Sequence, residues 1–226
     1  MRDAGDGVLR FLVYGVVALG ALGLAWVARK IAFARTVGGL PEPEERLRLL
    51  ERARDMRRRG ASLDACVADL RAQGVRAGVA RSLVLDMERE QPADVANPRE
   101  GAWGGYRFRY PGNWRIETVV PGIAIAVEGV GSGMVVVTLH GELEDVLREQ
   151  EPQIRDPERT RFDAWGAFRG DGVRLRGVHG RMRVPMELAV FEPAEADPPF
   201  VVLEMHALEE AHLVLPGLAL VRDSFA

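Results

Sequence analysis

The stretch YRFRYPGNW, residues 106–114, indicates the fold of the C-terminal half of this 226-residue chain. Aromatic and arginine side chains alternate over its first five residues, which is the pattern of a strand with one buried face. Pro111 and Gly112 then turn the chain, because proline cannot continue a strand ladder. Trp114 opens a second strand with a large side chain for the core. We expect these aromatic residues to anchor the core and not to contact a ligand.

The residues that follow predict an α+β domain over residues 106–226. Apolar runs predict six further strands, near residues 114–118, 123–127, 134–139, 173–179, 181–191 and 200–207. The run 134–139 is apolar on both faces, so we expect a central strand that is covered on both sides. A helix is expected over residues 142–150, and Pro216 is placed to open a final helix.

The opening motif resembles the F-x-x-x-Y-P-x-x-W opening of the PsbP-like family. That family includes the photosystem oxygen-evolving extrinsic subunit, the Ran-binding nuclear-import Mog group and mycobacterial lipoproteins such as the LpqN type. Trp165-Gly166 and the ending LVRDSF, residues 220–225, support the resemblance, which covers residues 106–226. It implies an antiparallel sheet sandwiched between helices in an α/β/α arrangement. It also implies a binding or assembly factor without a shared catalytic constellation, so no catalytic residue is carried over.

The segment before this domain predicts a small three-helix module, residues 44–91, between linkers at residues 36–43 and 92–105. Apolar residues at helical spacing, a capping serine at Ser62, and the helix-ending residues Gly60 and Gly74 mark its three helices. Cys66 falls on an apolar stripe and is expected in the core. The photosystem subunit has no such module, so its role is not expected here.

A DNA-binding helix-turn-helix is an alternative reading of the module. The turn at residues 74–76 would join its two helices, and Arg57-Arg58-Arg59 would contact phosphates or anionic lipid headgroups. However, residues 42–90 contain eleven arginines and ten acidic residues, which nearly cancel. The formal net charge of the whole chain is −3. This balance favours a solvated, salt-bridged module, and no nucleic-acid partner is expected.

A charge-free apolar run, FLVYGVVALGALGLAWVA, occupies residues 11–28 near the N-terminus. Its eighteen residues span about 27 Å as a helix, close to the thickness of a bilayer core. We therefore predict a transmembrane helix at about residues 10–30 of an N-terminal segment, residues 1–35. A cleaved signal peptide is the alternative, because residues 32–34 form a small-x-small site. The two aspartates before the run argue against cleavage.

The flanking charges predict how this helix lies in the membrane. Arg29, Lys30 and Arg35 follow it, whereas Arg2 and Arg10 precede it together with two aspartates. The positive-inside bias therefore places the C-terminal side in the cytoplasm. Lys30 is the only lysine, which is typical of a GC-rich bacterial genome. The sequence thus predicts a single-pass protein of the bacterial inner membrane; its oligomeric state stays open.

Chemistry-bearing motifs are sparse, and we assign no catalytic, cofactor-binding or metal-binding residues. Four histidines form the most plausible acid–base or metal set: His140, His179, His206 and His212. None has close ligand spacing, although Glu204 and His206 share a strand face. The chain has no nucleophile-elbow, Walker or dinucleotide motif. The glycine-rich residues 129–133 are expected to form a hairpin loop, because they open no helix.

These observations favour a membrane-anchored, non-catalytic interaction or assembly domain whose partner is another protein. Two alternatives stay open at this point. One is a membrane-tethered enzyme with a dispersed His/Glu site. The other is a membrane-bound DNA-binding regulator that uses residues 44–91.

Overall fold

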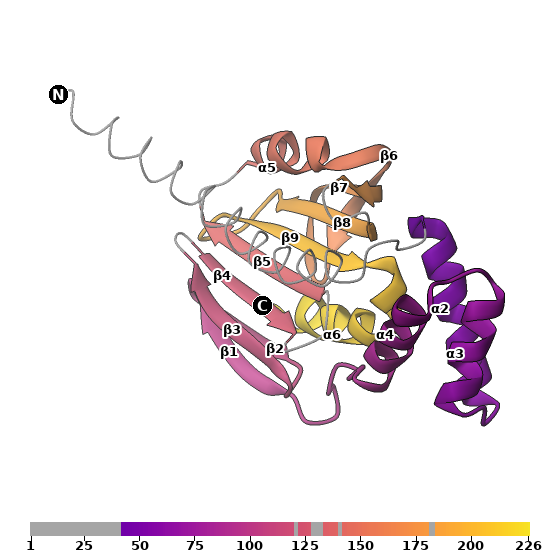
Figure 1. Ribbon diagram of the computed structural model, residues 1–226. Helices are drawn as coiled ribbons and strands as arrows, with labels where there is room; N and C mark the ends of the chain where they lie inside the picture. Colours follow the sequence, from indigo (N-terminus) through magenta and orange to yellow (C-terminus); the bar gives the residue numbers. More distant parts are fainter. Residues whose placement is uncertain (1–41, 120–121, 128–132, 140–141, 181–183) are drawn as a thin grey trace.

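The computed structural model describes residues 42–226, except for residues 120–121, 128–132, 140–141 and 181–183 (Figure 1). The predicted anchor at residues 11–28 lies outside the described residues, as does most of the glycine-rich loop. Within the part of the chain that is described, no helix is long and apolar enough to cross a membrane.

The centre of the C-terminal domain is a seven-stranded antiparallel sheet with the order β3-β4-β5-β9-β8-β7-β6 (Figure 1). Its strands are β3 (Trp114–Val119), β4 (Gly122–Val127), β5 (Gly133–Leu139), β6 (Ile154–Trp165), β7 (Phe168–His179), β8 (Val184–Pro193) and β9 (Phe200–Ala207). Consecutive hairpins build β3 to β5 and β6 to β9, and β5 then pairs with β9 across the centre. The predicted α+β class with an antiparallel sheet is confirmed.

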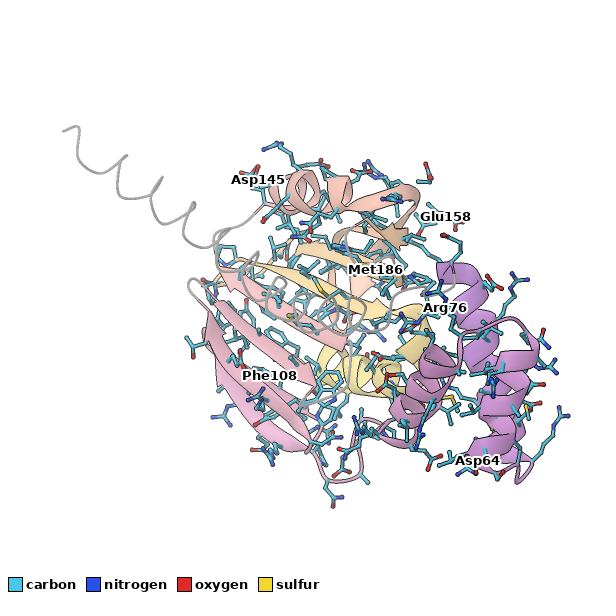
Figure 2. All side chains as sticks on the ribbon, in the orientation of Figure 1. Asp64, Arg76, Phe108, Asp145, Glu158 and Met186 are labelled. Carbon is cyan, nitrogen blue, oxygen red and sulfur yellow. The ribbon has the colours of Figure 1, made fainter. Side chains whose placement is uncertain are left out.

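Helices cover both faces of this sheet. The helix α5 (Leu143–Gln150) places Leu143 and Leu147 on one face, and α6 (Ala211–Ser224) places Leu218 and Val221 on the other. Figure 2 shows Asp145 of α5 and Phe108 of the β1–β2 hairpin on opposite sides of the sheet. This is the predicted sandwich of helices around a sheet.

The strand β5 confirms the reading of an apolar run as a doubly covered strand. Val135 and Val137 point into the core under α6, whereas Met134 and Val136 point into the core under α5. Each of these four side chains is buried. Burial of both faces removes the polar alternation that marks a half-exposed strand.

The opening motif connects two sheets. Its first five residues form β2 (Tyr106–Tyr110), which pairs with β1 (Arg99–Trp103) in a separate two-stranded sheet. Gly104 and Gly105 join the two strands at φ +60° and +92°, as a two-residue hairpin turn of the primed type requires. Trp114 then enters the main sheet. The hairpin lies on the same side of that sheet as α6, and its aromatic residues share the α6 core.

Three expectations need correction. The expected linker at residues 92–105 contains β1. Its residues EGAW show no alternation of apolar and polar side chains, because Gly101 makes room for the Phe108 ring. A Cβ at Gly101 would lie 2.5 Å from Phe108 Cε2. The long strand β6 was not expected, because it is a mostly exposed edge strand rich in charge and interrupted by Pro157. The helix α6 begins at Ala211, directly after the 3₁₀ turn η2 (Leu208–Glu210), so Pro216 lies inside it on the exposed side.

The helical module consists of α2 (Pro43–Arg58), α3 (Leu63–Ala72) and α4 (Ala77–Glu88), packed around one apolar cluster. Ser62 caps α3 as predicted, because its Oγ accepts a hydrogen bond from the Ala65 N–H at 3.1 Å. Gly60 and Gly74 both have φ +88° and end α2 and α3. Each end closes with a bond from the next N–H to the carbonyl five residues back, the Schellman pattern. The three helices are confirmed; the domain boundaries stay a prediction.

Candidate functional site

Polar side chains occupy one end of the sheet face that α6 covers. Strand register places Glu204, Ala189 and Arg174 side by side on β9, β8 and β7, and it places His206, Glu187 and Arg176 side by side in the next row. All six lie on the face of Val202 and Phe191, which belong to the α6 core. We call five of them the polar face: Arg174, Arg176, Glu187, Glu204 and His206.

Glu204 is the most buried carboxyl group of this face. Its side chain is buried, and its Oε1 accepts a hydrogen bond of 2.7 Å from the indole Nε1 of Trp165. A guanidinium nitrogen of Arg222 lies 3.7 Å from Oε2. Burial raises the pKa of Glu204, and the Trp165 hydrogen bond and the charges of Arg222 and Arg174 act in the opposite direction. Glu204 therefore connects β9 to the end of β6 and to α6.

The stretches that carry the family resemblance meet beside this carboxyl group. Gly166 has φ +58°, and a Cβ there would lie 2.1 Å from the carbonyl oxygen of Arg222. The Trp165 ring lies 5.3 Å from the Phe225 ring, and Phe225 in turn stacks on Tyr106 at 5.1 Å. The motif residues thus build one aromatic core, which confirms the expectation of a structural role for them.

His206 is a buried imidazole at the end of β9. Burial lowers its pKa, and the negative charge of Glu187 on the neighbouring strand acts in the opposite direction. Among the described residues, no hydrogen bond to the His206 ring is found. Burial therefore favours the neutral form of the ring. As predicted, it shares a strand face with Glu204.

The other histidines do not join this face. Alternation along β7 puts His179 on the α5 side with Leu175, and its Nε2 lies 3.3 Å from the Gln153 amide oxygen. His212 lies on α6, where its Nε2 is 3.5 Å from a carboxylate oxygen of Glu90. His140 lies outside the described residues. The sheet separates His179 from His206, so these two cannot build one site.

Metal chemistry has no geometric support in the described part of the chain. No group of three or more His, Cys, Asp or Glu side chains there is placed to hold a metal ion. Among the described residues, His206 shares its sheet face with Glu204 on the same strand and with Glu187 on the neighbouring strand. The pair that the sequence indicated, Glu204 with His206, is the pair on which we base the enzyme hypothesis.

Sequence reasoning named Glu204 and His206 but missed the residues around them. Trp165 and Arg222 reach Glu204 from positions far along the chain, which one sequence cannot pair. A signal was nevertheless present in β7, where Arg174 and Arg176 alternate with apolar residues. That alternation marks one polar face on an otherwise buried strand.

The arginine triplet of the module is occupied by carboxylates. A guanidinium nitrogen of Arg57 lies 2.9 Å from a Glu88 oxygen, and Arg58 and Arg59 both pair with Asp55. These contacts agree with the predicted salt-bridged module, and the absence of a nucleic-acid partner stays a prediction.

The single cysteine has the environment of a core residue. Cys66 is fully buried, and its Sγ lies 3.8 Å from the carbonyl oxygen of Ala53. Burial is the largest influence on the pKa of the thiol and raises it. A raised pKa disfavours the thiolate, which is the reactive form. The expected core role of Cys66 is confirmed.

Comparison of the sequence with protein-family models and with curated proteins gives no match. Among solved structures, the chain is similar to LpqN, described as involved in cell envelope biogenesis of Mycobacterium tuberculosis. The identity is 12%, the TM-score is 0.37, and the match covers 57% of this chain and 90% of that one. It is also similar to PsbP (CyanoP) from Synechocystis sp. PCC 6803, at 15% identity and TM-score 0.36, over 58% and 93% of the chains. Both proteins are of the types named above for the predicted PsbP-like resemblance, and no statement about the function of this chain follows from them.

Proposed function

We propose that this chain is a single-pass protein of the bacterial inner membrane whose C-terminal domain binds another protein and catalyses no reaction. One observation carries the non-catalytic part. Glu204, the group best suited to acid–base work, contacts Trp165 and Arg222, and these contacts join β9, the end of β6 and α6. A carboxyl group whose two oxygens both contact other elements in this way stabilises the fold.

The apolar run at residues 11–28 supports the anchor in this proposal. The excess of positive charge after the run supports a cytoplasmic position for the domain. The helical module would then lie between the membrane and the domain.

The polar face is the surface to which we assign the partner. The side chains of Arg174 and Glu187 are 42% and 24% exposed, and they lie 3.1 Å apart as an ion pair. Arg176 is exposed beside them. A sheet surface with half-exposed charges of both signs suits a protein partner that presents complementary charges, because such pairs set specificity.

Site-specific photocrosslinking in cells tests this proposal. A photoreactive residue at Arg176 is expected to yield one discrete crosslinked protein, and the same residue at Asp145, on α5, is expected to yield none. Deletion of residues 11–28 should remove the product, because the domain would leave the membrane. A crosslink at Asp145 alone, or none at either position, would overturn the proposal.

A second candidate function is a membrane-tethered enzyme that uses Glu204 and His206. The pKa values of these two groups shift in opposite directions on one strand face, as in acid–base pairs of active sites. The variants Glu204→Gln and His206→Gln separate the two functions. Both side chains are buried, so under our proposal the folded variants keep the Arg176 crosslink and complement a deletion strain. Loss of complementation with the crosslink kept would favour the enzyme.

A further inference from the structure

A buried ion pair joins the helical module to the C-terminal domain. Arg46 lies in the first turn of α2, and its guanidinium donates a hydrogen bond of 2.8 Å to Glu209 Oε1. The two side chains are 10% and 2% exposed. Glu209 belongs to η2, between β9 and α6, and α2 lies against both η2 and β8. The pair therefore connects two units that are far apart in the sequence.

Glu90 makes a second connection just after α4. Its Oε1 lies 2.5 Å from a guanidinium nitrogen of Arg54 in α2, and its Oε2 lies 3.5 Å from His212 Nε2 in α6. One carboxylate thus contacts both the module and the domain. Its side chain is 17% exposed, so solvent screens these contacts only partly.

The chain between the two units is also held. The Ala93 N–H donates to the Leu213 carbonyl at 2.8 Å. The Asn113 side chain accepts from the Asp94 N–H at 2.9 Å and donates to the Pro92 carbonyl at 3.0 Å. Residues 92–94 of the expected linker are therefore held on the domain by hydrogen bonds.

Because the Arg46–Glu209 pair is buried, it restricts how the module and the domain can move relative to each other. Two charges out of water hold together only in a narrow range of distances and angles, and the loss of an ion-pair partner is costly for a buried charge. A hinge motion between the module and the domain would break this pair and separate two buried charges. Exposed pairs such as Arg58–Asp55 carry no such penalty, because water replaces the partner.

We propose that Arg46 and Glu209 lock the helical module and the C-terminal domain into one rigid unit. The start of α2 then has a fixed position relative to the polar face. Its functional consequence rests on the proposed membrane anchor: beyond the expected linker at residues 36–43, the module and the polar face would move as one body and not as two. The module is thereby a rigid bracket and not a flexible tether.

A spin-label distance measurement on the full chain in lipid nanodiscs tests the lock. The labels go on Asp64→Cys in α3 and Asp145→Cys in α5, two positions on different units (Figure 2), in a Cys66→Ala background. The parent is expected to give a single narrow distance peak. Arg46→Ala is expected to lose that peak and to give a broad distribution. Arg48→Ala, an exposed arginine of the same helix, should keep the narrow peak.

Glu209→Gln provides a second variant if Arg46→Ala does not fold, because glutamine keeps the shape and removes the charge. It is also expected to broaden the distribution. A broad peak in the parent, or an unchanged narrow peak in both folded charge variants, would overturn the lock. Incorporation into the nanodisc is measured on the same sample. Failure to insert would count against the anchor and leave the distance result readable in solution.

Discussion

Trp114 packs directly on Gly217 of α6. A Cβ built at Gly217 would lie 2.4 Å from Trp114 Cζ2 and 2.8 Å from Pro111 Cγ. Pro111 and Trp114 are the last residues of the opening motif, so the motif forms the seat on which the final helix lies. The absence of a side chain at Gly217 permits this close approach of helix and sheet.

We expect Gly217→Ala to destabilise the fold by about 1–3 kcal/mol, because the added methyl group overpacks the contact with Trp114. Gly78→Ala is the matched control, since Gly78 also lies in a helix but has no atom within 4 Å of its would-be Cβ. That control should stabilise the protein by up to about 1 kcal/mol through helix propensity. Urea unfolding followed by tryptophan fluorescence measures both. Equal effects of the two substitutions would refute the close contact.

Replacement of Trp165 tests the hydrogen bond to Glu204. We expect Trp165→Phe to cost about 1–3 kcal/mol, because a buried carboxyl oxygen loses its donor. Trp103→Phe serves as the control, since Trp103 is only partly buried at the hairpin and lies against the same core. The free energy of unfolding of each variant decides the matter. A smaller loss of unfolding free energy in Trp165→Phe than in Trp103→Phe would contradict the stabilising role of Glu204.

The pH dependence of stability tests the burial of Glu204. Its pKa is raised in the folded protein, so the native state binds more protons than the unfolded state above the ordinary pKa of about 4.3. This contribution to stability is present at low pH and is lost as the pH rises through the raised pKa. Glu204→Gln has no such loss. The free energy of the variant relative to the parent should therefore improve between pH 4 and pH 7, and a flat difference would contradict the raised pKa.

The pH dependence of stability expected from His206 has the opposite sign. Its pKa is lowered in the folded protein, so the unfolded state binds more protons below the ordinary pKa of about 6.5. The stability it contributes is present above that pKa and is lost as the pH falls. We expect His206→Gln to weaken the decline of unfolding midpoints on acidification. An unchanged decline in the folded variant would show that His206 is not the buried group.

Local patterns predicted the elements whose signal lies within a few residues. The alternation in YRFRY specified β2, the apolar run at residues 134–139 specified β5, and Ser62 specified the start of α3. The strand β6 was not predicted, because an edge strand buries few side chains and its residues therefore have the composition of a loop. The prediction that Pro216 opens α6 was wrong, because proline favours the first turn of a helix but is tolerated at this exposed interior position.

The candidate site was predictable only in part, for a similar reason. Spacing placed Glu204 and His206 on one face, and that relation holds within a single strand. Their partners come from other elements: Trp165 from the end of β6, Arg222 from α6 and Glu187 from β8. Such contacts depend on strand order, which one sequence does not contain. The lock between Arg46 and Glu209 is of the same kind.

Membrane association and sidedness of the full chain test the central claim most directly. Bacterial membranes are washed with alkaline carbonate, and an Asp145→Cys variant is treated with a membrane-impermeant maleimide before and after the cells are opened. We predict that the chain stays in the membrane pellet and is labelled only in opened cells, and that a chain without residues 11–28 leaves the pellet. Release of the full chain by carbonate, or labelling in intact cells, would contradict a cytoplasmic domain held by a transmembrane anchor.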